Sequence, residues 1–287
     1  MTSIHQWRRT LAARLKPVAA DLAAFESDCL LGRVLGCGPT ELTLRAWEQL
    51  TPEQEESLER YLRRRLTGVP LAYVLGRAYF HGLELICDSR ALIPRPETEE
   101  LVEIALRSLP PPSSERRPLV IDIGTGSGNI ALALASVRSD LRLIATDTEL
   151  PSLQLADTNR LRLGLADRVL LLAGRTLSMF RERPFIDMIV ANPPYIALGD
   201  PNLDLSVIEH EPHSALFAGP SGLEIISELL EQAAPRLVPG GWLISEIGYE
   251  QAELLRSLAR DLADWEQPVL HRDLAGIERI MAICRAP

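Results

Sequence analysis

One short motif combines residue types that can do chemistry on a nitrogen atom: Asn192-Pro193-Pro194-Tyr195. It follows the apolar residues 188–191, and its prolines must end a strand because proline has no backbone N–H to donate. The side-chain carbonyl of Asn192 and the backbone carbonyl of Pro193 then offer two acceptors side by side. Together they can hold a planar amino group by both of its protons, while the Tyr195 ring stacks on its plane.

An amide or exocyclic base nitrogen is a poor nucleophile because its lone pair is delocalised. Acceptors on both of its N–H bonds favour the pyramidal geometry that the nitrogen adopts as positive charge develops on it. The motif therefore predicts an amino-group clamp in which Asn192, Pro193 and Tyr195 are catalytic and Pro194 helps to bind the substrate. The alternative is a strand-terminating Pro-Pro turn with Tyr195 in the core.

A glycine-rich segment, "DIGTGSG", follows another apolar run. Its glycines allow a tight turn and a close approach of the backbone to a ligand at a helix N-terminus. A dinucleotide fingerprint requires its third glycine at position 129, where this sequence has Asn129, so no pyrophosphate is demanded. The expected cofactor-binding residues are Asp122, Gly124, Thr125, Gly126, Ser127 and Gly128.

Asp147 ends the next apolar run, about 20 residues beyond the glycines. A carboxylate at this place can accept hydrogen bonds from both ribose hydroxyls of a nucleoside. The alternative is a strand-end carboxylate that caps the following helix. Together with the glycine segment, Asp147 fits S-adenosylmethionine better than NAD.

The elements that must position these residues alternate after residue 118, which predicts a doubly wound α/β sheet. Strands are expected at residues 119–123, 141–146, 168–172, 187–191, 242–246, 268–271 and 279–284, and helices at 129–137, 150–163, 222–236 and 249–263. Such folds bind ligands at the carboxyl ends of their strands, where the glycine segment, Asp147 and the clamp all fall.

The residues before this α/β region show a different pattern of apolar and polar positions. Apolar residues recur at helical spacing over residues 4–66, with Thr51 as a cap before Pro52, and predict a helical domain at residues 1–67. Residues 68–96 mix glycines, aromatics and alternating apolar residues, and are expected to form a linking β-hairpin. The catalytic domain is then expected at residues 97–287, beginning with a helix.

Composition excludes several classes of function. The formal net charge of −9 argues against a bare nucleic-acid-binding surface, although the basic residues 60–66 form either a solvated helix face or a local patch. Lys16 is the only lysine, which excludes a Walker phosphate loop. The four scattered cysteines predict reduced thiols and no metal site. No stretch of about 18 apolar residues occurs, so we expect a cytoplasmic protein without a membrane partner.

Several longer stretches occur in order between about residue 68 and the C-terminus: "PLAYVLGRAYFHGLEL", "LIPRPETEELV", "DIGTGSGNIALALA", "ATD", "VANPPYI", "EHEPHSALFAGPSGLEII", "LVPGGWLISEIG" and "RDLAGIERIM". In these stretches the chain resembles the release-factor glutamine N5-methyltransferases, the HemK/PrmC family. Residues 1–67 match this family only in their helical character.

The resemblance implies a fold and a reaction. The fold is a seven-stranded, Rossmann-like S-adenosylmethionine-dependent methyltransferase domain with its last strand reversed, joined by a β-hairpin to a small N-terminal helical bundle. The reaction is methyl transfer to the side-chain amide nitrogen of the glutamine in the Gly-Gly-Gln motif of class 1 peptide chain release factors, which leaves S-adenosylhomocysteine. The helical bundle would recognise the release factor.

The same resemblance implies roles for individual residues. The glycine segment and Asp147 would hold the cofactor, and residues 192–195 would hold the glutamine. The expected roof of the site consists of Pro94 and Arg95 toward the substrate and Pro96 and Glu97, with Asn192, toward the cofactor. The chain departs from the family at Arg175 and Thr176, where members usually have an acid followed by an aromatic or apolar residue, so the adenine contacts stay open.

Two other functions remain possible from the sequence. An N6-adenine or N2-guanine nucleic-acid methyltransferase would use the same clamp for a flipped base. The acidic balance counts against that function, and no stable nucleic-acid partner is expected. A non-catalytic binding module would need no clamp at all.

Overall fold

The computed structural model describes residues 2–112, 116–200, 205–273 and 275–287. Its contacts divide the chain into two compact units. The first consists of the N-terminal residues up to Arg77 together with helix α9 (Leu205–His210), and the second consists of the remaining residues. None of the helices within the described ranges is long and apolar enough to cross a membrane.

The first unit is a helical bundle, as the spacing of its apolar residues predicts. Its main helices are α1 (Ile4–Ala19), α2 (Ala23–Leu35), α3 (Pro39–Leu44), α4 (Pro52–Leu66) and α5 (Leu71–Leu75). The three longest helices bury one face each in a shared core that includes Leu11, Leu30 and Leu58. The cap predicted at Thr51 is confirmed, because its hydroxyl accepts a hydrogen bond from the Gln54 N–H in a capping box.

The basic residues 60–66 lie in the second half of α4, and only part of them forms a solvated face. Arg60 is exposed, but the Arg65 side chain is only 12% exposed and pairs with the buried Glu26. Two guanidinium nitrogens of Arg65 donate to the two carboxylate oxygens, at 2.8 and 3.0 Å, and the Val18 carbonyl accepts a further hydrogen bond. The expectation of a solvated face is wrong for Arg65, because its guanidinium links α1, α2 and α4.

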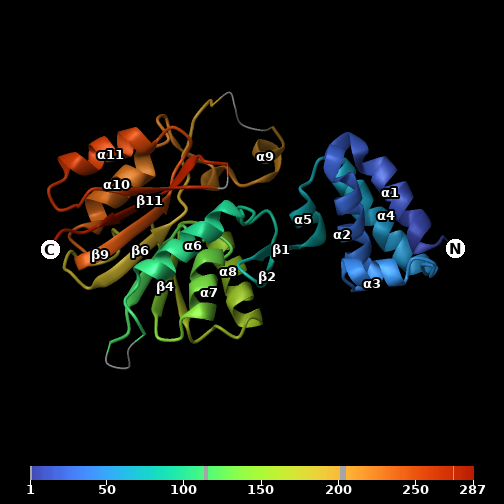
Figure 1. The fold of residues 1–287 in the computed structure, drawn as a ribbon, viewed down its shortest axis with the longest axis horizontal. Helices are drawn as coiled ribbons and strands as arrows, with labels where there is room; N and C mark the ends of the chain where they lie inside the picture. Colours follow the sequence, from blue (N-terminus) through green and yellow to red (C-terminus); the bar gives the residue numbers. More distant parts are fainter. Residues whose placement is uncertain (1, 113–115, 201–204, 274) are drawn as a thin grey trace. The chain divides into compact units, whose positions relative to one another are not determined.

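The second unit is built on a seven-stranded sheet (Figure 1). The strands are β3 (Leu119–Ile123), β4 (Arg142–Asp147), β5 (Val169–Ala173), β6 (Ile186–Ala191), β9 (Leu237–Glu246), β10 (Val269–Arg272) and β11 (Glu278–Cys284). Their order is β10-β11-β9-β6-β3-β4-β5, and β11 runs antiparallel to both of its neighbours. The predicted doubly wound sheet with a reversed last strand is confirmed.

Helices cover both faces of this sheet (Figure 1). They are α6 (Glu97–Ser108), α7 (Asn129–Val137), α8 (Leu150–Arg162), α10 (Glu224–Ala233) and α11 (Ala252–Asp261). Successive strand residues face opposite sides, so Val120 belongs to the core cluster with α6 and α7, whereas Ile121 belongs to the cluster with α10 and α11. Burial on both sides is the reason why the central strands read as continuous apolar runs.

Some element boundaries differ from the predicted ones. The helices expected at 222–236 and 249–263 are shorter at both ends, as α10 and α11. Strand β9 begins at Leu237, which pairs with Ile186, and the residues between Leu237 and Trp242 form an irregularity in the pairing with β6. Two short strands that the pattern does not predict form a separate parallel pair: β7 (Ile196–Ala197) and β8 (Phe217–Gly219).

The segment 68–96 contains two elements where a single hairpin is expected. Helix α5 comes first and joins the core of the first unit. The hairpin strands that follow are β1 (Arg77–Phe80) and β2 (Leu83–Ile86). Their turn has φ values of 47° at His81 and 76° at Gly82, as a tight two-residue hairpin turn requires. Phe80 of this hairpin is buried in the core of the second unit.

Candidate cofactor and substrate site

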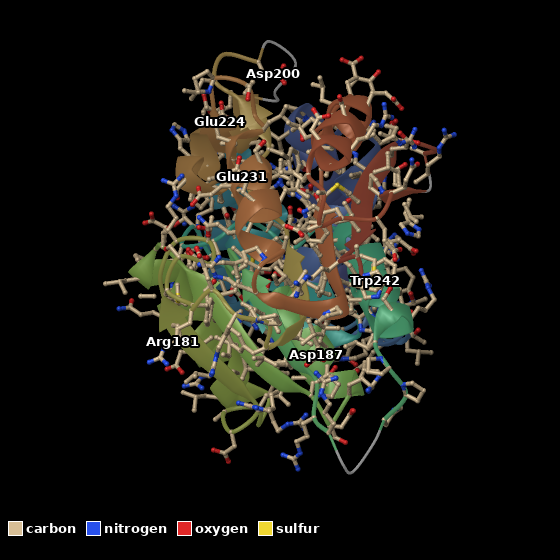
Figure 2. All side chains as sticks on the ribbon, turned by 90° about the vertical axis from the view of Figure 1, so that its left-hand side faces the viewer. Arg181, Asp187, Asp200, Glu224, Glu231 and Trp242 are labelled. Carbon is tan, nitrogen blue, oxygen red and sulfur yellow. The ribbon has the colours of Figure 1, made fainter. Side chains whose placement is uncertain are left out.

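A cavity of about 210 Å³ lies at the carboxyl ends of the parallel strands of the second unit. In Figure 2, Asp187, near the amino end of β6, lies in the lower half of the view, and Asp200, beyond the carboxyl end of β6, lies at the top. The expected site residues that line the cavity are Pro94, Arg95, Gly124, Thr125, Gly126, Ser127, Asp147, Asn192, Pro193 and Pro194. The expected residues outside this lining are Pro96, Glu97, Asp122, Gly128 and Tyr195.

Asp122 fixes the glycine segment through hydrogen bonds. It is completely buried, and its Oδ2 accepts hydrogen bonds from the Thr125 hydroxyl at 2.6 Å and from the Ala131 N–H at 3.2 Å. The Thr125 N–H in turn donates to the Thr146 carbonyl on β4, which ties the turn to the neighbouring strand. Burial raises the pKa of Asp122 to about 7. Asp122 therefore shapes the loop that lines the cavity.

Gly128 closes the same turn and caps α7 with a φ of 86°, in the left-handed region. A Cβ at this position would lie 2.9 Å from the Leu132 side chain and 3.3 Å from that of Ala156. The buried Asn159 on α8 secures the turn, because its Nδ2 donates to the Ser127 carbonyl at 2.9 Å. The sequence pattern gave no sign of Asn159, which lies within an ordinary amphipathic helix.

Asp147 makes the contact to the following helix that was considered for it, and it also lines the cavity. One carboxylate oxygen accepts the Gly126 N–H and the other accepts the Glu149 N–H, each at 2.9 Å, so Asp147 ties the glycine segment to the start of α8. Burial raises the pKa of this carboxyl group above its usual range. A carboxylate oxygen can accept more than one hydrogen bond, and Asp147 lines the cavity. Acceptor capacity therefore remains for a hydroxyl-bearing ligand.

The Asn192 side chain is fixed by a hydrogen bond at its nitrogen end. Its Nδ2 donates to the Thr98 hydroxyl at 3.2 Å, and Thr98 donates to Glu246 Oε2 at 2.6 Å. Because the nitrogen is engaged, Oδ1 is the end of the amide that is left to accept a hydrogen bond from a ligand in the cavity. Thr98 and Glu246 are both buried, and sequence reasoning gave neither a role, although both lie in stretches that carry the family resemblance.

Tyr195 is held at its ring end and at its backbone. Its hydroxyl donates to Glu246 Oε1 at 3.1 Å, and its carbonyl accepts from Gln251 Nε2 at 2.9 Å. Gln251 also donates to the Gly222 carbonyl, so one side chain joins two loops behind the clamp. Burial raises the pKa of the Tyr195 phenol. Stacking of the Tyr195 ring on the substrate stays a prediction.

The roof segment is tied down by Glu211, which sequence reasoning left without a role. Glu211 is buried, and its Oε2 accepts the Ile93 N–H at 3.0 Å while its Oε1 lies 2.5 Å from the Arg95 guanidinium. Arg95 is therefore engaged in an ion pair at the edge of the cavity. This pair ties the expected roof segment to the loop that carries Glu211.

The loop after β5 also lines the cavity, through Gly174, Arg175 and Thr176. Thr176 has a φ of 45° and donates its hydroxyl proton to Glu228 on α10 at 2.7 Å. Arg175 pairs with the same carboxylate at 2.9 Å. Glu228 of α10 thus fixes this loop through both residues.

Comparison with known proteins covers almost the whole chain. A family model for the PrmC N-terminal domain matches residues 6–76, and a model for the methyltransferase small domain matches residues 102–210. A release factor glutamine methyltransferase from Bradyrhizobium diazoefficiens is 40% identical over 286 residues, which are 99% of this chain and 96% of that protein. This chain belongs to the release factor glutamine methyltransferase family.

Other similarities agree with this family. The release factor glutamine methyltransferase of Escherichia coli is 38% identical over 274 residues, which are 96% of each chain. A methyltransferase from Pyrococcus furiosus has the same fold, with a TM-score of 0.51 at 19% identity over 80% of this chain and 100% of that one. The family resemblance and the S-adenosylmethionine-dependent methyltransferase fold are confirmed.

Proposed function

We propose that this chain methylates the side-chain amide nitrogen of the glutamine in the Gly-Gly-Gln motif of class 1 peptide chain release factors. Relatives that carry the name release factor glutamine methyltransferase match nearly its full length. The structural observation behind the proposal is the acceptor end of Asn192, which stands beside Pro193 in a cavity shared with the glycine segment.

The cavity residues fit S-adenosylmethionine as the methyl donor. Asp147 offers acceptors for the ribose hydroxyls, and the Ser127 hydroxyl is buried in the lining without a hydrogen-bond partner among the described residues. The turn at residues 124–127 would hold the methionine part, and residues 174–176 would lie along the adenine. When bound, this cofactor supplies a methyl group activated by a sulfonium.

The clamp residues would act on the glutamine nitrogen. Asn192 Oδ1 and the Pro193 carbonyl would each accept one of its N–H bonds, which orients the nitrogen toward the methyl group. As the carbon–nitrogen bond forms and the carbon–sulfur bond breaks, positive charge develops on the nitrogen. The two acceptors stabilise that charge more than they stabilise the neutral amide, and a proton then leaves to water. The products are N5-methylglutamine and S-adenosylhomocysteine.

The first unit would bind the body of the release factor, because the clamp itself reads only an amide. This unit carries large apolar side chains that are strongly exposed: Leu22, Phe25, Leu44 and Trp47. Exposed aromatic and aliphatic side chains of this size are typical of protein-binding surfaces. Contacts of this kind, remote from the reacting nitrogen, would hold the Gly-Gly-Gln loop at the cavity.

A methyl-transfer assay with three substrates tests the proposal. The protein is incubated with isotopically labelled S-adenosylmethionine and a class 1 release factor, DNA or RNA. We expect label on the release factor alone, at the Gly-Gly-Gln glutamine. Label on an adenine or guanine amino group would overturn the proposal in favour of a nucleic-acid methyltransferase.

A further inference from the structure

Glu246 lies level with the clamp although it belongs to a different strand. It ends β9, whose parallel neighbour β6 ends one residue before Asn192. In the register of these strands Ala191 pairs with Ser245, so Asn192 and Glu246 are both the next residues along. Burying a carboxylate is unfavourable unless it is well paired, and Glu246 is almost completely buried. Its position therefore needs a reason.

The hydrogen bonds around Glu246 have a defined direction. Its two oxygens accept from the Thr98 hydroxyl at 2.6 Å and from the Tyr195 hydroxyl at 3.1 Å. A threonine hydroxyl has a single proton, and here that proton goes to Glu246, so Thr98 can only accept from Asn192. The Asn192 amide must then turn its nitrogen to Thr98 and its oxygen to the cavity.

We propose that Glu246 is a positioning residue for methyl transfer, which sets the orientation of the Asn192 amide through Thr98 and holds Tyr195 through its phenol. The inference rests on the proposed function, since a substrate amino group needs the Asn192 oxygen as its acceptor. Without the carboxylate, the Thr98 proton can point to Asn192 Oδ1. The amide then presents its N–H bonds to the substrate amino group, and two sets of donors face each other.

Neighbouring groups act on the ionisation of Glu246 in opposite directions. Burial raises the pKa of Glu246, and Glu97 on α6 raises it further. The hydrogen bonds from Thr98 and Tyr195 lower it, as does Arg279 on β11. The ionised carboxylate is the form that accepts both hydroxyl protons at once, and therefore the form that orients the clamp.

Isosteric substitutions separate this role from packing. Thr98→Val keeps the shape and removes the hydroxyl, Thr98→Ser keeps the hydroxyl, and Glu246→Gln replaces one acceptor by a donor. We expect Thr98→Val and Glu246→Gln to lower kcat by about tenfold to a hundredfold, as loss of an oriented acceptor does, while the Kd of S-adenosylmethionine stays within about twofold. Thr98→Ser should recover most of the loss. Thr158→Val and Glu231→Gln, at exposed positions outside the cavity, are the matched controls; Figure 2 labels Glu231.

Double substitutions with Asn192→Ala distinguish positioning from general support of the fold. If Thr98 and Glu246 act through Asn192, then Thr98→Val and Glu246→Gln cause little further loss of kcat in the Asn192→Ala background. Losses that multiply in that background, or normal kcat in both single variants, would overturn the proposal. Circular dichroism identifies any variant that fails to fold. If either Thr98→Val or Glu246→Gln does not fold, the double-mutant comparison of the other one with Asn192→Ala tests the proposal.

Failure of this inference can be told apart from failure of the proposed function. The unmodified chain tests the function, by its activity on a release factor. The ratios between variants and the unmodified chain test the positioning role, on whichever amino-group substrate the unmodified chain methylates. An inactive unmodified chain that still binds S-adenosylmethionine would contradict both.

Discussion

Replacement of Asp147 by alanine should weaken cofactor binding far more than it slows the reaction. Each carboxylate oxygen of Asp147 already accepts one backbone N–H, and the remaining acceptor capacity faces the cavity. Because Asp147 is buried, ribose hydroxyls would meet an acceptor that has lost most of its water, and the same burial raises the pKa of its carboxyl group. Two charge-assisted hydrogen bonds together contribute about 3 kcal/mol, or about a hundredfold in Kd.

Calorimetric titration with S-adenosylmethionine measures this effect, and saturated turnover gives its kinetic counterpart. The ribose bonds exist in the ground state and in the transition state alike, so the loss should fall on Kd and KM, with kcat changed by less than about fivefold. Asp21→Ala, at an exposed position of the first unit, is the control. An unchanged Kd, or a loss confined to kcat, would refute the assignment of Asp147 to the ribose.

Three further outcomes are expected. Asn192→Ala should lower kcat by about a hundredfold or more at nearly constant cofactor Kd, since the Asn192 side chain donates its hydrogen bond to Thr98. A near-normal kcat would refute the catalytic role of Asn192. Because the folded-state pKa of Asp122 is raised to about 7 from 3.8, the stability that this group contributes is present below pH 4 and lost as pH rises toward 7; Asp122→Asn should flatten the change in Tm over that window, and parallel Tm curves would contradict this. Phe25→Ala with Trp47→Ala should reduce kcat/KM on a release factor about tenfold or more and leave a short Gly-Gly-Gln peptide unaffected; equal losses would mean that these side chains serve the fold.

The parts of the site that could be predicted from sequence are those in which the neighbouring residues in the chain explain why a given residue type stands at its position. Asp147 follows a glycine-rich turn at a fixed distance, and the prolines after Asn192 must end a strand. The alternating pattern placed these segments at the same edge of the sheet, where the structure brings them together around one cavity. Local sequence is enough here because the backbone of each segment determines where its polar groups point.

The residues that could not be predicted act across distant segments. Glu211 reaches the roof segment, and Glu246 reaches Thr98 and Tyr195, only because the sheet order brings their elements together. In the sequence each is a single acid among many, without a spacing that sets it apart. For Arg65 the sequence offers only a solvated face or a local patch, since nothing near it in the chain indicates its buried partner Glu26.

The most direct measurement is mass spectrometry of a class 1 release factor after incubation with the full-length protein and S-adenosylmethionine. We predict a gain of one methyl group on the side-chain nitrogen of the Gly-Gly-Gln glutamine, and no such gain when the Asn192→Ala variant replaces the unmodified protein. Methylation at another residue, or undiminished methylation by the Asn192→Ala variant, would contradict it.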